Sequence, residues 1–172
     1  MTTFTEQDHG DLARLVGRFF RSLDERHFDE DWARAFFTDD IRGRSPVGDS
    51  RGRPAMLRQT AEAVGRFDRT QHMATDVLTA PAPDGRTATV TWNALMTHVH
   101  RDTTLKTRGP DADPVFTVGG HWRATVRRTP DGWRFQETSV DAVWTRGEPP
   151  LLGPAADGRR EPPDGRPDPA RR

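Results

Sequence analysis

The sequence contains no cysteine and no tyrosine, and Lys106 is its single lysine. The absence of cysteine excludes disulfides, thiolate metal ligands and cysteine nucleophiles. The absence of tyrosine removes a common catalytic proton donor. No apolar run approaches the length that spans a membrane, and the first ten residues are polar rather than signal-like. We therefore expect a soluble, cytoplasmic protein.

Neither sign of charge is in excess, because 26 lysines and arginines balance 26 aspartates and glutamates. A balanced chain gives no electrostatic reason to expect nucleic acid or an anionic membrane as partner. The length of 172 residues suits one domain with a core and is short for two. We expect one domain, with no nucleic-acid and no membrane partner.

The first part of the chain has the period of amphipathic helices. Six apolar residues recur at steps of three and four, which predicts a helix with one face in a core. These residues are Leu12, Leu15, Val16, Phe19, Phe20 and Leu23. A second helix is predicted over Asp29 to Phe37, and a third over residues 52–67 with Pro54 near its start. Between these two helices, Ile41 to Ser45 predicts a short strand.

After Phe67 the sequence becomes rich in threonine, valine and tryptophan, which is typical of strands. Four strands are predicted, over residues 70–80, 86–100, 115–128 and 133–144. Asp84-Gly85 and Asp131-Gly132 are hairpin signals, and a longer loop surrounds Gly109-Pro110. Helices followed by a run of antiparallel strands predict an α+β fold rather than alternating βαβ units.

The residues from Glu148 onward are dominated by proline, glycine, aspartate and arginine. Such a segment cannot bury enough apolar surface to offset its ordering entropy. The composition predicts a disordered Pro/Arg-rich tail over residues 148–172, in which Leu151-Leu152 is the one pair suited to local docking.

Several short segments, taken in order, resemble those of a known family. They lie at residues 23–32, 37–41, 69–72, 96–100, 131–135 and 141–144. The ordered set resembles the SnoaL-like and scytalone dehydratase-like branch of the nuclear transport factor 2-like superfamily. The resemblance covers Leu12 to Gly147 and implies a cone-shaped α+β barrel, with N-terminal helices packed on a strongly curved antiparallel sheet. We therefore expect a SnoaL-like cone domain over residues 1–147.

The resemblance implies a catalytic role for His72, since Arg69-Thr70-Gln71-His72 is similar to the start of the strand that carries the family's catalytic histidine. It places Asp24 at the end of the first helix, where a carboxylate can orient an imidazole and make its other nitrogen basic. The spacing after Asp24 departs from the family, so Asp29 and Asp31 compete for this role. The tyrosines that the family's dehydratases use are missing here.

His98 and His100 are two residues apart and so point to the same side of a strand. Either one is a candidate proton donor in the pocket, and both also suit a strand end in solvent. A metal site formed by these two and His72 is an alternative, but the resemblance implies a site without metal or cofactor. The expected apolar wall consists of Phe20, Trp92, Met96 and Trp122. Asp141 is a candidate buried carboxylate on this wall.

These residues predict a cofactor-independent acid–base enzyme, a dehydratase, isomerase or cyclase, that acts on a small hydrophobic, oxygenated, polyketide-like substrate. The alternative is a non-catalytic binding or accessory subunit, because one fold hosts many functions. We also expect a homodimer formed through the outer face of the sheet, because a threonine- and valine-rich face is seldom left bare.

Overall fold

The computed structural model describes residues 3–46 and 48–151. Its first helix, α1 (Glu6–Glu25), buries the predicted apolar stripe from Leu12 to Leu23. The Asp8 carboxylate accepts hydrogen bonds from the Thr5 backbone N–H at 2.8 Å and the Thr5 hydroxyl at 3.0 Å, which fixes the start of the helix. Arg26 adopts a left-handed conformation with φ 61° and ends it.

The next elements form a short helix, a hairpin and a second helix. They are α2 (Glu30–Phe36), β1 (Phe37–Ser45), β2 (Gly48–Arg51) and α3 (Arg53–Gly65). Asp29 caps α2 by accepting a hydrogen bond from the Trp32 backbone N–H at 2.7 Å. The strand predicted at Ile41 begins four residues earlier, at Phe37, because Phe37 and Thr38 are already buried against the core.

The four predicted strands are present within a few residues of their predicted bounds. They are β3 (Phe67–Pro81), β4 (Thr87–His100), β5 (Val115–Thr129) and β6 (Gly132–Arg146). The connection between β4 and β5, predicted as a loop, contains the short helix α4 (Asp102–Arg108). No described helix is both long enough and apolar enough to span a membrane.

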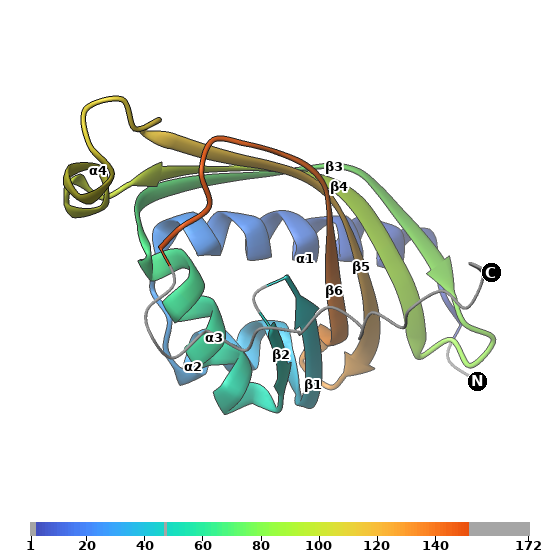
Figure 1. Ribbon diagram of the computed structural model, residues 1–172. Coiled ribbons are helices and arrows are strands. Elements are labelled where there is room, and N and C mark those ends of the chain that lie inside the picture. The colour runs from blue at the N-terminus through green and yellow to red at the C-terminus, as the bar shows by residue number, and fades with distance from the viewer. Residues whose placement is uncertain (1–2, 47, 152–172) are drawn as a thin grey trace, which may run out of the picture.

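The sheet has six strands in the order β2-β1-β6-β5-β4-β3. The prediction of an antiparallel sheet is wrong at one pair, since β1 and β6 run parallel. The reason is topological: the first long strand lies beside the last one, and the chain between them crosses over through α3 and the meander. The strands curve around α1, while α2 and α3 lie beside β1 and β2 (Figure 1).

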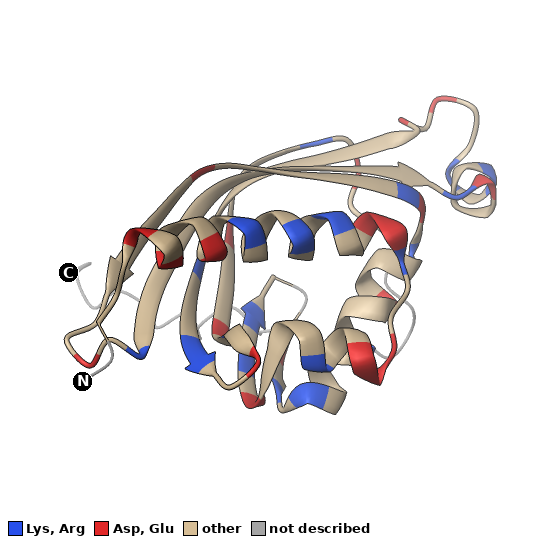
Figure 2. Cartoon of the chain, turned by 180° about the vertical axis from the view of Figure 1, so that it is seen from behind, with Lys and Arg blue, Asp and Glu red and all other residues tan. Residues whose placement is uncertain are grey.

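The core lies between α1 and the concave face of the sheet. The turns of α1 that face outward carry acidic and basic residues (Figure 2), and the opposite face packs on the strands. Phe19 and Phe20 each contact aromatic rings from the strands, including Trp122 and Phe135. The amphipathic pattern of the sequence therefore sets which side of α1 meets the sheet.

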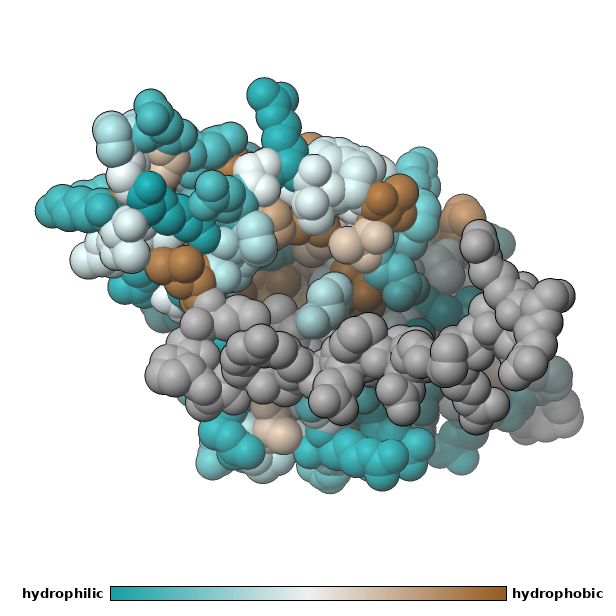
Figure 3. Space-filling model, in the orientation of Figure 1, coloured by the Kyte–Doolittle hydropathy of each residue, from teal (hydrophilic) through white to brown (hydrophobic). Residues whose placement is uncertain are grey.

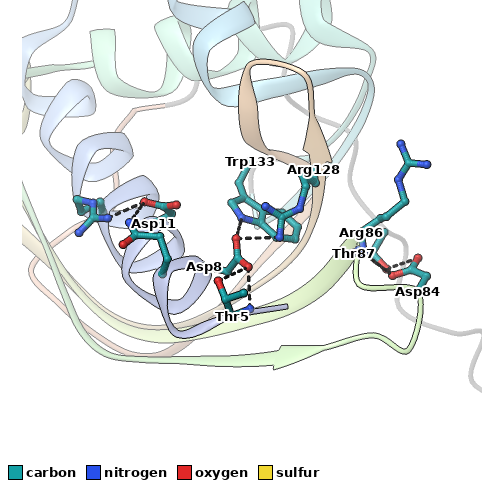
Figure 4. Close-up of polar contacts among 10 residues, drawn as sticks. Thr5, Asp8, Asp11, Asp84, Arg86, Thr87, Arg128 and Trp133 are labelled. Carbon is teal, nitrogen blue, oxygen red and sulfur yellow. Dashed lines mark hydrogen bonds and ion pairs between the residues drawn. The ribbon is translucent and has the colours of Figure 1, made fainter. Parts of the chain in front are cut away.

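A buried carboxylate ties the start of α1 to the hairpin between β5 and β6 (Figure 4). Asp8 is 3% exposed, pairs with the Arg128 guanidinium at 2.8 Å and accepts a hydrogen bond from the Trp133 indole N–H at 3.1 Å. The Arg128 guanidinium outweighs the opposing effect of burial and, with the bonds from Thr5 and Trp133, holds the pKa of Asp8 well below its usual value.

The outer face of the sheet carries a row of apolar side chains across four strands. Met73, Leu95, Gly119 and Trp144 are successive partners in the register, and the three side chains are 36–50% exposed. Gly119 lacks a Cβ that would overlap the Trp144 ring, so the indole lies flat at this position. The homodimer expected through this face stays a prediction.

We expect Asp8→Asn to lower the free energy of unfolding at pH 7 by about 1–3 kcal/mol, because it removes a charge-assisted contact and leaves Arg128 unpaired. The folded pKa lies below the unfolded value of about 3.9, so the contribution of Asp8 is complete above that pH and is lost below it. Urea unfolding at neutral and acidic pH measures both effects.

The matched control is Asp11→Asn on the same helix, whose carboxylate is 42% exposed and pairs with Arg14 at the surface. We expect this control to change stability by less than about 0.5 kcal/mol. An equal loss in the two variants would contradict the structural role of Asp8.

Candidate active site

A cavity of about 450 Å³ lies between α1, α3 and the concave face of the sheet. In the space-filling view a hollow with a hydrophobic floor opens toward the viewer (Figure 3). The side chains around the cavity are mostly apolar, with two imidazoles among them. They include Phe19, Leu23, Val64, Phe67, His72, Met96, His98, Phe116, Val118, Trp122, Val140, Ala142, Pro149 and Pro150.

The last turn of α1 brings Asp24 against the start of β3. The His72 Nδ1 lies 2.7 Å from Asp24 Oδ1, and the His72 backbone N–H donates to Asp24 Oδ2 at 2.9 Å. Thr70, two residues before His72 and so on the same side of the strand, donates its hydroxyl to Asp24 Oδ1 at 2.8 Å. Three donors from one strand therefore hold this carboxylate.

The hydrogen bonds keep Asp24 ionised although it is partly buried. Burial alone would raise the pKa of the carboxyl group. The bonds from the ring and the backbone of His72 and from the Thr70 hydroxyl act in the opposite direction and lower it below its usual value. Asp24 is therefore a charged acceptor next to the imidazole at neutral pH.

The contact with Asp24 fixes the tautomer of His72. A carboxylate only accepts hydrogen bonds, so the proton of the neutral ring lies on Nδ1 and the lone pair on Nε2. The His72 side chain is 5% exposed and lines the cavity. Its edge meets the ring of Phe20 at a centroid distance of 5.7 Å, which limits how the imidazole can turn. His72 is thus positioned as a base.

His98 is a second imidazole in the cavity, with its ring centroid 5.5 Å from that of His72. Its Nδ1 lies 3.1 Å from the backbone carbonyl oxygen of Phe116. Because a carbonyl only accepts, this nitrogen carries the proton and Nε2 does not. Burial, followed by the proximity of His72, lowers the pKa of His98 to about 4. His98 is therefore a neutral hydrogen-bond acceptor at physiological pH.

The wall residues expected from the sequence divide into two layers. Met96 and Trp122 line the cavity. Trp92 and Phe20 are 2% exposed and lie in the core, where Trp92 stacks on Trp122 at 5.5 Å between ring centroids. Phe20 and Trp92 therefore support the inner layer rather than facing the cavity.

The alternation of the sequence had suggested that Asp141 shares the face of Trp133 and Phe135. In the structure it does not. The register of β6 shifts between the partners of Thr125 and Val126, and this bulge reverses the alternation after Phe135. Asp141 is exposed and lies at a second depression on the outer side, with Asn93 and His121. Val140 and Ala142 point inward in its place.

Of the two alternatives, His98 lines the cavity and His100 does not. His100 is 2% exposed, and its Nε2 lies 3.0 Å from the carbonyl oxygen of Glu148 and 3.1 Å from the Arg108 guanidinium. His72, His98 and His100 therefore do not converge on one point as three metal ligands would. Asp29 is occupied as the cap of α2, and Asp31 pairs with Arg34 at the surface, so neither competes with Asp24.

Three parts of this site were not predicted from the sequence. Thr70 had a usable signal, because its spacing from His72 places both residues on one face of the strand. The backbone carbonyl of Phe116, which fixes the tautomer of His98, had none. The approach of Pro149 and Pro150 to the cavity had none either, since they belong to the segment predicted as a tail.

The sequence matches the SnoaL-like domain family over residues 6–139. The chain belongs to this family. The SnoaL-like protein described here is 20% identical to the Kfla4162 protein from Kribbella flavida, with a TM-score of 0.72 and coverage of 82% of this chain and 94% of that one. No curated protein matches its sequence.

Two further solved structures resemble this SnoaL-like protein. A candidate scytalone dehydratase from Novosphingobium aromaticivorans is 22% identical, with a TM-score of 0.64 and coverage of 88% and 93% of the two chains. The hexachlorocyclohexane dehydrochlorinase LinA-type3 from Novosphingobium barchaimii is 14% identical, with a TM-score of 0.66 and coverage of 87% and 96%. At these identities the likeness establishes the fold, and the cone expected from the sequence is confirmed.

We expect the His98 ring of this SnoaL-like protein to titrate with a midpoint of about 4. The unfolded chain binds this proton already below about pH 6.5, so stability is complete above that pH and falls as the pH drops toward 4. NMR of the ring C–H groups measures the midpoint, and urea unfolding at pH 7 and 4.5 measures the loss. His98→Phe should lose less stability over this interval, and a midpoint near 6.5 would contradict the assignment.

Proposed function

We propose that this protein is a cofactor-independent acid–base lyase that eliminates water from a small hydrophobic molecule bearing a hydroxyl group β to a carbonyl. The observation that carries the proposal is the contact of 2.7 Å between Asp24 and His72, whose imidazole faces an apolar cavity. A base held in one tautomer by a charged carboxylate, next to a mostly apolar cavity, is an arrangement that suits proton abstraction beside a carbonyl.

The first step is removal of the proton on the carbon beside the carbonyl. His72 Nε2 accepts this proton, and the electron pair of the broken C–H bond moves onto the carbonyl oxygen as an enolate. The ring then carries a positive charge, which the ionised Asp24 stabilises at Nδ1. General bases of this kind contribute about a hundred- to ten-thousand-fold in rate.

In the second step the enolate collapses and the bond between the β carbon and its oxygen breaks. The electron pair forms the carbon–carbon double bond, and the departing oxygen takes the proton from His72 Nε2 and leaves as water. One imidazole therefore serves as base and then as acid, and the ring returns to its starting tautomer. Delivery of this proton to a different carbon, or to the opposite face of the same carbon, would give isomerisation instead.

His98 has a different role from the proton donor expected from the sequence. Its proton is directed to the Phe116 carbonyl, so Nε2 is able only to accept a hydrogen bond. We assign to His98 the binding of a substrate hydroxyl, which would orient the C–H bond toward His72. His100 takes no part, because it lies outside the cavity.

Two similar structures support an elimination. The dehydratase and the dehydrochlorinase named above are, by their names, enzymes that remove water and hydrogen chloride. The apolar wall formed by Met96, Trp122 and Val140 suits a hydrophobic, polyketide-like carbon skeleton. Cyclisation uses the same enolate and is the second outcome that this geometry accommodates.

Incubation in heavy water with a panel of aromatic and alicyclic β-hydroxyketones tests the proposal, because proton exchange requires only the carbonyl and the C–H bond beside it. We expect deuterium to enter the carbon beside the carbonyl and an enone absorbance to appear for at least one member of the panel. His72→Gln should reduce the rate of deuterium entry by about a hundredfold or more, since it removes the base. Mass spectrometry measures the exchange.

The matched control is His121→Gln on the outer face, whose imidazole contacts Asn93 at 2.8 Å and lies away from the cavity. It should leave the exchange unchanged. Binding of these ketones without exchange would favour the non-catalytic alternative, and exchange that survives in His72→Gln would remove His72 as the base.

A further inference from the structure

The chain that follows β6 returns across the open end of the molecule toward α3 (Figure 1). Gly147 makes this return possible, because its φ is 80° and a Cβ at this position would overlap the backbone carbonyl of Val115. Pro149 and Pro150 then line the cavity. These two prolines thus form one wall of the cavity, although the composition of residues 148–172 had predicted a disordered tail.

One arginine holds this wall. The Arg108 Nε pairs with the Glu148 carboxylate at 2.9 Å, and its Nη2 donates to the carbonyl oxygen of Pro149. The Arg108 side chain is only 10% exposed, whereas Glu148 is 60% exposed. Because Arg108 is the last residue of α4, this guanidinium joins the connection between β4 and β5 to the segment after β6.

His100 is the third residue in the contact between Arg108 and Glu148. Its Nε2 lies 3.1 Å from the Arg108 guanidinium and 3.0 Å from the Glu148 carbonyl oxygen. The ring accepts from Arg108 in one tautomer and donates to Glu148 in the other, so either form contacts the group. His100 also packs on Phe67, which in turn packs on His98 in the cavity.

We propose that Arg108, His100 and Glu148 form a clasp that sets access to the cavity by holding Pro149 and Pro150 over its mouth. Arg108 is the positioning residue of this clasp. Pro149 and Pro150 donate no backbone hydrogen bond, so among the described residues the bonds to the carbonyl oxygens of Glu148 and Pro149 and the Arg108–Glu148 ion pair hold this wall. The clasp requires no chemistry at His72 and would act in the same way if the protein only binds its ligand.

The absence of cysteine allows a direct measurement of access. Val118 lines the cavity, and Val118→Cys introduces a single thiol of similar volume there. The rate at which the neutral reagent N-phenylmaleimide labels this thiol in the full-length chain reports how often the cavity opens. In this background we expect Arg108→Gln to accelerate labelling by about tenfold or more, because it removes the ion pair with Glu148 and the charged donor to the Pro149 carbonyl oxygen.

Three comparisons make the result specific. Lys106→Gln, an exposed change on the same helix, should leave the labelling rate unchanged. Glu148→Gln should accelerate labelling less than Arg108→Gln, since it removes the ion pair and keeps the bond to the Pro149 carbonyl. The double variant Arg108→Gln with Glu148→Gln should label no faster than Arg108→Gln alone, because both act on one contact.

Equal labelling rates with and without Arg108→Gln would overturn the proposal. Equal acceleration by Lys106→Gln would also overturn it, since loosening of α4 in general would then explain the result. Melting temperatures identify a variant that fails to fold, in which case Glu148→Gln alone decides: acceleration supports the clasp, and an unchanged rate rejects it. The labelling rates do not depend on whether His72 catalyses deuterium exchange. The labelling experiment therefore tests the clasp separately from the proposed reaction.

Discussion

The contact between Asp24 and His72 is the interaction on which the rest of the site depends. It joins the end of α1 to the start of β3, and it decides which nitrogen of the imidazole is basic. Thr70 and the backbone of His72 complete the set of donors that keeps the carboxylate ionised despite burial. Without this contact the cavity would be an apolar pocket with two imidazoles and no defined base.

The same helix is fixed at its other end by a second carboxylate. Asp8 binds Arg128 and Trp133 at the β5–β6 hairpin, so acidic residues tie both ends of α1 to the sheet. The apolar stripe between them fills the interior near Asp8 and leaves the cavity near Asp24. The position of the site thus follows from where α1 is held and where its large side chains end.

The periodic parts of the sequence predicted the fold well, because burial alone sets a helical or alternating pattern. The pairing of Asp24 with His72 was accessible through the family resemblance. The placement of Asp141 was not, because a one-residue bulge in β6 reverses which side chains face inward and leaves no mark in composition. The clasp was missed for another reason: its members are far apart in sequence, and Glu148–Pro150 has the composition of a linker.

Nitrogen NMR of the histidine rings in the free protein and in Asp24→Asn directly tests the role of the contact between Asp24 and His72. We predict that neutral His72 carries its proton on Nδ1 and that Nε2 is unprotonated. In Asp24→Asn the side-chain amide is able to donate to Nδ1, so the proton should move to Nε2. A proton on Nε2 of neutral His72 in the unaltered protein, or no change of tautomer in Asp24→Asn, would contradict the role assigned to this pair.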